Sequence, residues 1–132
     1  MDTGTHRIRV LVAEDNHDLA AAITALIAAE CDMQVDGIVD RVSHLFDLDG
    51  SNAHVLVLDL ELCGESSVPA LAHMQRALPQ LAVIIYSGHD PRDLGSVLAR
   101  IDRCEYVMKS GNPDELIDAI RRAANKATGA EA

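Results

Sequence analysis

The sequence predicts an α/β fold: a doubly wound sheet of five parallel strands with helices on both faces, formed by one domain. Short apolar runs at residues 8–13, 54–58 and 82–86 are bounded by polar residues, as expected of strands buried on both faces. Segments with helical periodicity lie between these runs, so strand and helix alternate along the chain. At 132 residues, with 48% hydrophobic and 24% charged side chains, the chain has the size and composition of a single globular domain.

The first half of the chain predicts three strands and two helices. The strand at residues 8–13 is followed by apolar residues at helical spacing, which indicate a helix. A second strand at residues 34–39 and a short helix within residues 42–49 are weaker patterns, and the run at 54–58 forms the third strand. The apolar positions of the first helix are Leu19, Ile23, Leu26 and Ile27.

The second half continues the same alternation. A helix precedes the fourth strand at residues 82–86, and another helix separates this strand from a weaker fifth strand at residues 105–108. Five such strand and helix units predict right-handed crossovers, and of the two common strand orders we expect 2-1-3-4-5. The apolar positions of the two helices are Val68, Leu71, Met74 and Leu78, and then Leu94, Val97, Leu98 and Ile101.

The last helix has the clearest start signal in the sequence. Asn112 is a favoured N-cap residue, Pro113 fits the first helical position, and Glu115 is placed to close a capping box. We expect this helix to end near residue 125, with residues 127–132 forming a tail or the start of a linker. The single domain would then span residues 1–132, with a core at about residues 8–125.

Charge and cysteine content exclude several classes of protein. The net charge of -10 opposes direct binding to nucleic acid or to anionic lipid membranes. Cys31, Cys63 and Cys104 are odd in number and lack C-x-x-C spacing, so we expect reduced thiols and neither a disulfide framework nor a zinc cluster. No signal peptide is apparent and no segment approaches the roughly 18 apolar residues of a membrane span. These features predict a cytoplasmic protein.

Polar residues that follow the predicted strands form the candidate site. Glu14 and Asp15 follow the first strand, Asp59 the third, Ser87 the fourth and Lys109 the fifth. Ligands of open parallel sheets bind beyond the carboxyl ends of the strands. In the order 2-1-3-4-5 these four strands are consecutive neighbours, so the five side chains are expected to converge on one pocket.

The three carboxylates indicate a hard cation and phosphoryl chemistry. Carboxylates brought together repel one another unless a positive charge lies between them, and Mg²⁺, with Mn²⁺ as an alternative ion, prefers such oxygen ligands. With the ion bound, Asp59 is expected to act as a nucleophile towards phosphorus and form an aspartyl phosphate. Lys109 and the Ser87 hydroxyl would then stabilise the phosphoryl oxygens.

The motifs V-A-E-D-N, V-L-V-L-D-L, V-I-I-Y-S-G and E-Y-V-M-K-S together resemble the CheY-like receiver domains of two-component response regulators, over roughly residues 8–125. The resemblance implies a flavodoxin-like (βα)5 fold and a magnesium site. By this resemblance, Asp15 and Asp59 bind the ion through their carboxylates, Glu61 through its backbone carbonyl, and Glu14 through water.

The resemblance also implies a signalling role rather than an enzyme, with self-phosphorylation and autodephosphorylation as its only activities. A histidine kinase or phosphotransfer protein would phosphorylate Asp59, which would draw Ser87 inward and move Tyr106 to a buried rotamer. The surface of the fourth helix, fifth strand and fifth helix would change and control an effector or output domain outside this sequence, and phosphorylation would favour a homodimer. Glu61 and His89 are hypothesised to border the pocket and tune hydrolysis.

Several positions depart from the receiver pattern. Cys63 and Ser67 lie in the loop after Asp59, so we expect an altered loop there, and Asp102, Arg103 and Glu105 should make the expected switch surface more charged. Cys63 and Ser110 replace Pro, Ser67 replaces Gly, and Asp102, Arg103 and Glu105 replace small residues.

Two other functions remain open on the sequence alone. The first is a receiver-like docking module that works without phosphorylation, against which the complete set of pocket residues argues. The second is a small phosphatase of the haloacid dehalogenase type. Phosphatases of this type also combine an Asp-x-acidic motif with Ser or Thr and Lys on a parallel sheet, and Asp59-Leu60-Glu61 fits that motif. In that class, however, the nucleophile opens the fold and the acidic pair comes last, whereas here the acidic pair comes first.

Overall fold

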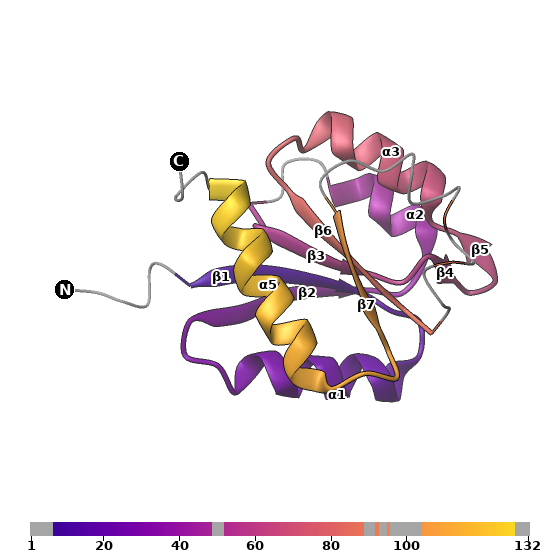
Figure 1. Cartoon of the computed structure of the whole chain (residues 1–132). Helices are drawn as coiled ribbons and strands as arrows, with labels where there is room; N and C mark the ends of the chain where they lie inside the picture. The colour runs from indigo at the N-terminus through magenta and orange to yellow at the C-terminus, as the bar shows by residue number, and fades with distance from the viewer. Residues whose placement is uncertain (1–6, 49–51, 89–91, 93–94, 96–103, 129–132) are drawn as a thin grey trace.

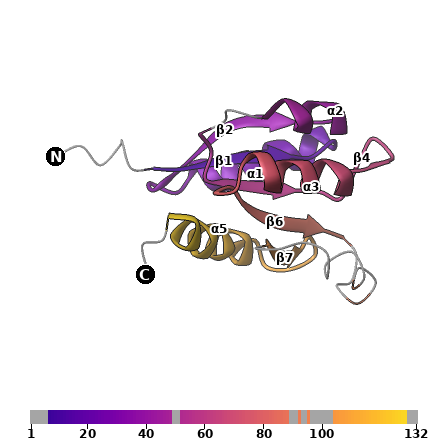
Figure 2. The ribbon, with the colours of Figure 1, turned by 90° about the horizontal axis from the view of Figure 1, so that it is seen from above.

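The structure is a computed structural model, and it describes residues 7–48, 52–88, 92, 95 and 104–128. Its main feature is a sheet of five parallel strands in the order β2-β1-β3-β6-β7. Figure 2 shows β2 and β7 at opposite edges of this sheet. Since β6 and β7 are the fourth and fifth strands of the sheet in chain order, the predicted order 2-1-3-4-5 is confirmed. The strands are β1 (Ile8–Ala13), β2 (Met33–Val39), β3 (Val55–Leu58), β6 (Ala82–Ser87) and β7 (Cys104–Met108).

Helices cover both faces of the sheet (Figure 1). Helices α1 (His17–Ala28) and α5 (Pro113–Thr128) lie on one face, and α2 (Val42–Leu45) and α3 (Val68–Ala77) lie on the other. A 3₁₀ turn, η2 (Phe46–Leu48), follows α2 directly. This arrangement explains why the central strands are apolar on both sides.

The two faces of the sheet bury two separate apolar clusters. Alternate residues of β1 divide between them: Val10 and Val12 pack with α1 and α5, whereas Leu11 and Ala13 pack with α2 and α3. The other central strands divide in the same way. The core therefore consists of two apolar layers, one on each face of the sheet, between the strands and the helices that cover them.

The start of α5 follows its sequence signals. Asn112 Oδ1 accepts a hydrogen bond of 2.9 Å from the Asp114 amide, and the helix begins at Pro113. The predicted end near residue 125 is wrong by three residues, because the helix continues to Thr128 and includes part of the expected tail. Residues 123–128 contain neither Gly nor Pro, so nothing in the sequence stops the helix there.

One element was not predicted, a short antiparallel hairpin of β4 (Glu61–Leu62) and β5 (Glu65–Ser66). Cys63 and Gly64 form its turn with positive φ angles of 53° and 78°. A positive φ is unusual for a residue with a side chain, and Gly64 supplies the second left-handed position without a steric penalty. Figure 1 shows the hairpin beyond the carboxyl ends of the strands, next to the start of α3.

Two of the sequence-based expectations concern residues that the structure does not describe. The helix expected around Leu94, Val97, Leu98 and Ile101 lies outside the described residues, as do Asp102 and Arg103. Within the described part of the chain, no helix combines the length and the apolar character needed to cross a membrane.

Candidate functional site

The predicted site residues meet at the carboxyl edge of the sheet. Glu14 and Asp15 follow β1, Asp59 follows β3, Ser87 ends β6 and Lys109 follows β7. These residues line a common cleft of about 740 Å³. The predicted convergence of the five side chains is therefore observed, and it results from the strand order, which places β1, β3, β6 and β7 side by side.

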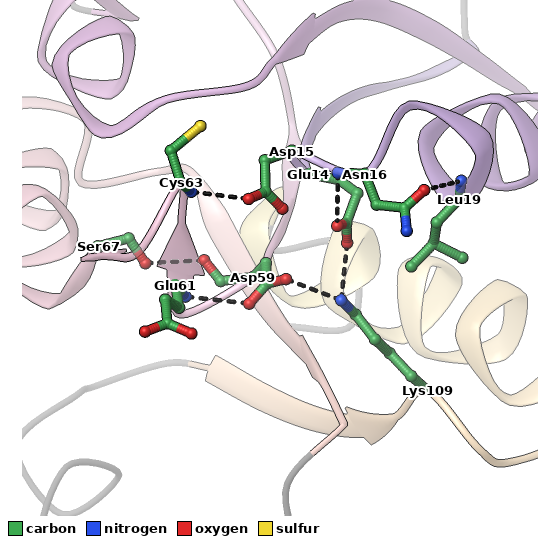
Figure 3. Close-up of polar contacts among 9 residues, drawn as sticks. All are labelled: Glu14, Asp15, Asn16, Leu19, Asp59, Glu61, Cys63, Ser67 and Lys109. Atoms are coloured by element: carbon green, nitrogen blue, oxygen red, sulfur yellow. Dashed lines mark hydrogen bonds and ion pairs between the residues drawn. The ribbon is translucent and has the colours of Figure 1, made fainter.

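Lys109 is the positive charge at the centre of the acidic group. Its Nζ atom lies 2.7 Å from Asp59 Oδ2 and 2.8 Å from Glu14 Oε1. Figure 3 shows the Lys109 side chain reaching between these two carboxylates. Burial alone would lower the pKa of Lys109, but the hydrogen bonds to Asp59 and Glu14 outweigh it and raise this pKa above its ordinary value. Lys109 is therefore a permanent cation in this cleft at neutral pH.

Backbone amides hold each carboxylate in place. The Glu61 amide donates to Asp59 Oδ1 at 3.0 Å, the Cys63 amide to Asp15 Oδ2 at 2.7 Å, and the Asn16 amide to Glu14 Oε2 at 3.1 Å. The first two donors belong to the β4–β5 hairpin, which therefore orients both aspartates.

The donor set of the cleft fits a small, hard cation. Carboxylate oxygens of Glu14, Asp15 and Asp59 all lie within 4.8 Å of one another. Glu14 is only 3% exposed, so its charge needs compensation from Lys109 or from a bound ion. Oxygen ligands in a partly open cleft, with room for water, suit Mg²⁺, which keeps several waters when bound to proteins.

The remaining predicted residues occupy different positions relative to the cleft. Ser87 is 2% exposed, and its carbonyl accepts a hydrogen bond of 2.8 Å from the Lys109 amide. Tyr106 lies in β7 opposite Ile85, and its hydroxyl is buried without a hydrogen-bond partner in the described structure. The Glu61 carboxylate points away from Lys109 (Figure 3). His89 lies outside the described residues.

Two contributions to the site were missed on the sequence. The Cys63 amide reaches Asp15, and the Ser67 hydroxyl donates a hydrogen bond of 2.8 Å to the Asp59 carbonyl oxygen. A backbone amide has no sequence signature of its own. The signal that was available is Gly64, because glycine adopts the positive φ angles of a tight turn without a steric penalty.

Comparison with known proteins identifies the family. A sequence model of the response regulator receiver domain matches residues 10–121. The chain belongs to this family. Phosphorylation of an aspartate and binding of Mg²⁺ at an acidic pocket are general to receiver domains, which act in signalling and are not classical enzymes.

Two curated relatives of this receiver domain are transcriptional regulators. The uncharacterized transcriptional regulatory protein YxjL of Bacillus subtilis is 29% identical over 119 residues, which make up 89% of this chain and 55% of that protein. The transcriptional regulatory protein MctR of Rhizobium johnstonii is 26% identical over 124 residues, or 92% of this chain and 58% of that protein. The receiver chain thus spans little more than half the length of these relatives.

Solved receiver structures confirm the predicted flavodoxin-like fold. A LuxR-family two-component response regulator from Aurantimonas sp. SI85-9A1 has a TM-score of 0.83 at 19% identity, covering 91% of this chain and 86% of that chain. The response regulator TrrA from Thermotoga maritima, solved in complex with Mg²⁺–BeF, has a TM-score of 0.75 at 20% identity, covering 87% of this chain and 97% of that chain.

Proposed function

We propose that this chain is a phosphorylation-dependent signalling receiver in which Asp59 accepts a phosphoryl group beside a bound Mg²⁺. One observation carries the proposal: Lys109 lies between Asp59 and Glu14, 2.7 and 2.8 Å from their carboxylate oxygens, in a cleft that also contains Asp15. A lysine, an acidic cation site and an accessible aspartate are the groups that phosphoryl transfer to a carboxylate requires.

Asp15 and Asp59 would hold the ion through their carboxylates, Glu61 through its backbone carbonyl, and Glu14 through a water molecule. The ion would neutralise negative charge on the transferred phosphoryl group. Mn²⁺ has the same preference for oxygen ligands and would serve in its place.

Phosphoryl transfer would proceed by attack of an Asp59 carboxylate oxygen on phosphorus. The new O–P bond forms as the bond to the donor breaks, and the donor leaves with the bonding electrons, as acetate does from acetyl phosphate. Lys109, already hydrogen-bonded to Asp59 Oδ2, is within reach of the incoming phosphoryl oxygens. The Ser87 hydroxyl would donate a hydrogen bond to another of these oxygens.

Signalling would follow from a change at β7. Movement of Ser87 toward the phosphoryl group would change the space next to Tyr106, whose buried hydroxyl has no partner in the described part of the chain. An unsatisfied buried hydroxyl gains from any rearrangement that gives it a partner. The surface around β7 and α5 would then bind a downstream effector or output domain, or a second copy of the chain, after a histidine kinase or phosphotransfer protein has phosphorylated Asp59.

Two residues close to Asp59 and Ser87 in the sequence would tune how long the phosphoryl group persists. Glu61 and His89 are two residues beyond Asp59 and Ser87 respectively, where their side chains would influence the approach of the hydrolytic water. Exchanging each for Ala and following phosphate loss tests this role. An unchanged lifetime in both variants would remove it.

The proposed phosphorylation is tested by intact mass spectrometry after incubation with Mg²⁺ and acetyl phosphate. We expect one labile phosphoryl adduct that requires Mg²⁺ and is absent from Asp59→Asn. Asp47→Asn, which changes an exposed aspartate of η2, is the matched control and should keep the adduct. No adduct, and no binding of beryllofluoride, under conditions that modify another receiver would instead support a docking module that works without phosphorylation.

A further inference from the structure

Ser67 is a buried hydroxyl that contacts the proposed phosphoacceptor. Its side chain is fully buried, and among the described residues only Glu14 and Ser87 are also buried polar or charged residues. Both of those residues line the cleft. The Ser67 hydroxyl donates a hydrogen bond of 2.8 Å to the backbone carbonyl of Asp59 (Figure 3). A buried hydroxyl with a single defined partner is held in one orientation.

The position of Ser67 in the chain makes this contact unexpected. Helix α3 begins at Val68, so Ser67 is its N-cap residue, and a serine there ordinarily accepts a hydrogen bond from an amide of the first helical turn. Ser67 makes no such bond. The exposed Ser66 instead accepts the Val68 amide at 3.2 Å. The Ser67 hydroxyl is therefore directed to Asp59 at the expense of its usual capping role.

The contact completes the anchoring of Asp59. The Asp59 amide donates to the Ala13 carbonyl at 3.0 Å, which ties it to β1, and its carbonyl accepts the Ser67 hydroxyl. The Ser67 amide also donates to the Leu60 carbonyl at 2.8 Å. Ser67 thus restrains two successive peptides, the Asp59–Leu60 peptide through its hydroxyl and the Leu60–Glu61 peptide through its amide.

The Glu61 amide belongs to the next peptide along the chain, the one whose Leu60 carbonyl accepts the Ser67 amide. This amide donates to Asp59 Oδ1 at 3.0 Å and lies two residues beyond Asp59 in the chain. If the peptide after Asp59 rotated, the Glu61 amide would move away from Oδ1, and the carboxylate would lose the bond that sets its orientation. Small errors in the position of a reacting group are costly for the rate, because phosphoryl transfer depends mainly on positioning.

We propose that Ser67 is a positioning residue for phosphoryl transfer, which orients the Asp59 carboxylate through the backbone of the Asp59-Leu60-Glu61 segment. This inference rests on the proposed function of Asp59. Loss of the Ser67 hydroxyl would therefore lower the rate of phosphorylation, whether or not it also lowers the stability of the fold.

The test compares the rate constant of adduct formation from acetyl phosphate at saturating Mg²⁺ for the wild type and Ser67→Ala. Loss of one hydrogen bond that positions the nucleophile is expected to slow the reaction about 3- to 10-fold. Ser67→Thr, which keeps the hydroxyl, should restore the rate to within about 2-fold. Thr24→Val is the matched control, since the Thr24 hydroxyl also donates to a backbone carbonyl, that of Ala20 at 2.8 Å, but in α1 and away from the cleft.

The outcomes separate positioning from a structural role. A slower rate in Ser67→Ala, with an unchanged rate in Thr24→Val, would support positioning, provided that both are measured well below their thermal unfolding midpoints. Equal rate constants in Ser67→Ala and wild type, whatever the change in midpoint, would overturn it. If Ser67→Ala does not fold, Ser67→Gly makes the same comparison. A wild-type chain that forms no adduct would overturn the proposed function, and this inference with it.

Discussion

The ammonium group of Lys109 donates a hydrogen bond of 2.7 Å to Asp59 Oδ2, so the proposed phosphoacceptor already has a positive partner before any phosphoryl group is present. The same ammonium group lies 2.8 Å from Glu14 Oε1. One cation thus compensates two carboxylates at the carboxyl edge of the sheet. Any cation that enters the cleft must share these oxygens with Lys109, which links lysine, metal ion and phosphoryl group energetically.

Replacing Lys109 by Met should expose the repulsion among the carboxylates. Without Mg²⁺, we expect the free energy of unfolding to fall by about 1–3 kcal/mol, because Glu14, which is only 3% exposed, loses the partner that compensates its charge, whereas Lys109 and Asp59 are partly exposed. Mg²⁺ should restore stability and bind about 3- to 10-fold more tightly than to the wild type, because the competing cation is gone. Urea unfolding with and without Mg²⁺ measures both effects. Weaker Mg²⁺ binding in Lys109→Met would contradict this account.

The contribution of Lys109 to stability should disappear only in alkali. Hydrogen bonds to Asp59 and Glu14 hold the pKa of Lys109 above its ordinary value of 10.5, despite the opposing effect of burial. A group whose pKa is raised on folding stabilises the protein fully below its unfolded pKa, and this stabilisation is lost as the pH rises through the folded pKa. The stability difference between wild type and Lys109→Met should therefore be constant from about pH 6 to 9 and shrink above about pH 10.5. A difference that already vanishes near pH 8 would rule out a raised pKa.

Asp15→Asn should weaken Mg²⁺ binding while leaving the fold intact. The substitution removes one of three carboxylates that approach one another within 4.8 Å, and an amide is a poorer ligand for a hard divalent cation. We expect the dissociation constant measured by calorimetry to rise at least about 10-fold. Asp18→Asn, which changes an exposed aspartate in the first turn of α1, is the control and should leave it unchanged. Equal losses in both variants would indicate a general charge effect.

Tyr106→Phe should not destabilise the unphosphorylated protein. The Tyr106 hydroxyl is buried and lacks a hydrogen-bond partner in the described structure, so removing it also removes an unfavourable desolvation. We expect the free energy of unfolding to stay the same or to rise by about 1 kcal/mol. Chemical denaturation measures this directly. A loss above about 1 kcal/mol would mean that the hydroxyl makes a hydrogen bond in solution.

The sheet and the convergence of the site residues were predictable because each depends on a strong pattern. Apolar runs identify the strands, and a polar residue after each run identifies the edge where ligands bind. Asp59, Ser87 and Lys109 each stand at the end of such a run, and the strand order brings them together. The start of α5 was predictable for a similar reason, since Asn112 and Pro113 act locally and need no tertiary contact.

The hairpin and its contacts could not be predicted in the same way. The β4–β5 hairpin comprises two-residue strands, too short for an alternating pattern to be recognised. Its contributions to the site are the amides of Glu61 and Cys63, and amides are present at every position except proline. The residue type of Ser67 favours helix capping, whereas its actual hydrogen-bond partner, the Asp59 carbonyl, depends on the tertiary path of the loop.

Ile120→Ala should destabilise the fold far more than Ile38→Ala, since the two isoleucines differ only in their surroundings. Ile120, on α5, is fully buried against the sheet, whereas Ile38, on the edge strand β2, is 50% exposed. Removing a buried isoleucine side chain leaves a cavity and costs about 2–5 kcal/mol. A half-exposed side chain at an edge leaves none, and its loss should cost less than about 1 kcal/mol. Urea unfolding of both variants measures the difference. Comparable losses would mean that α5 does not pack on the sheet as described, and the position of Lys109, which lies in the turn between β7 and this helix, would have to be reconsidered.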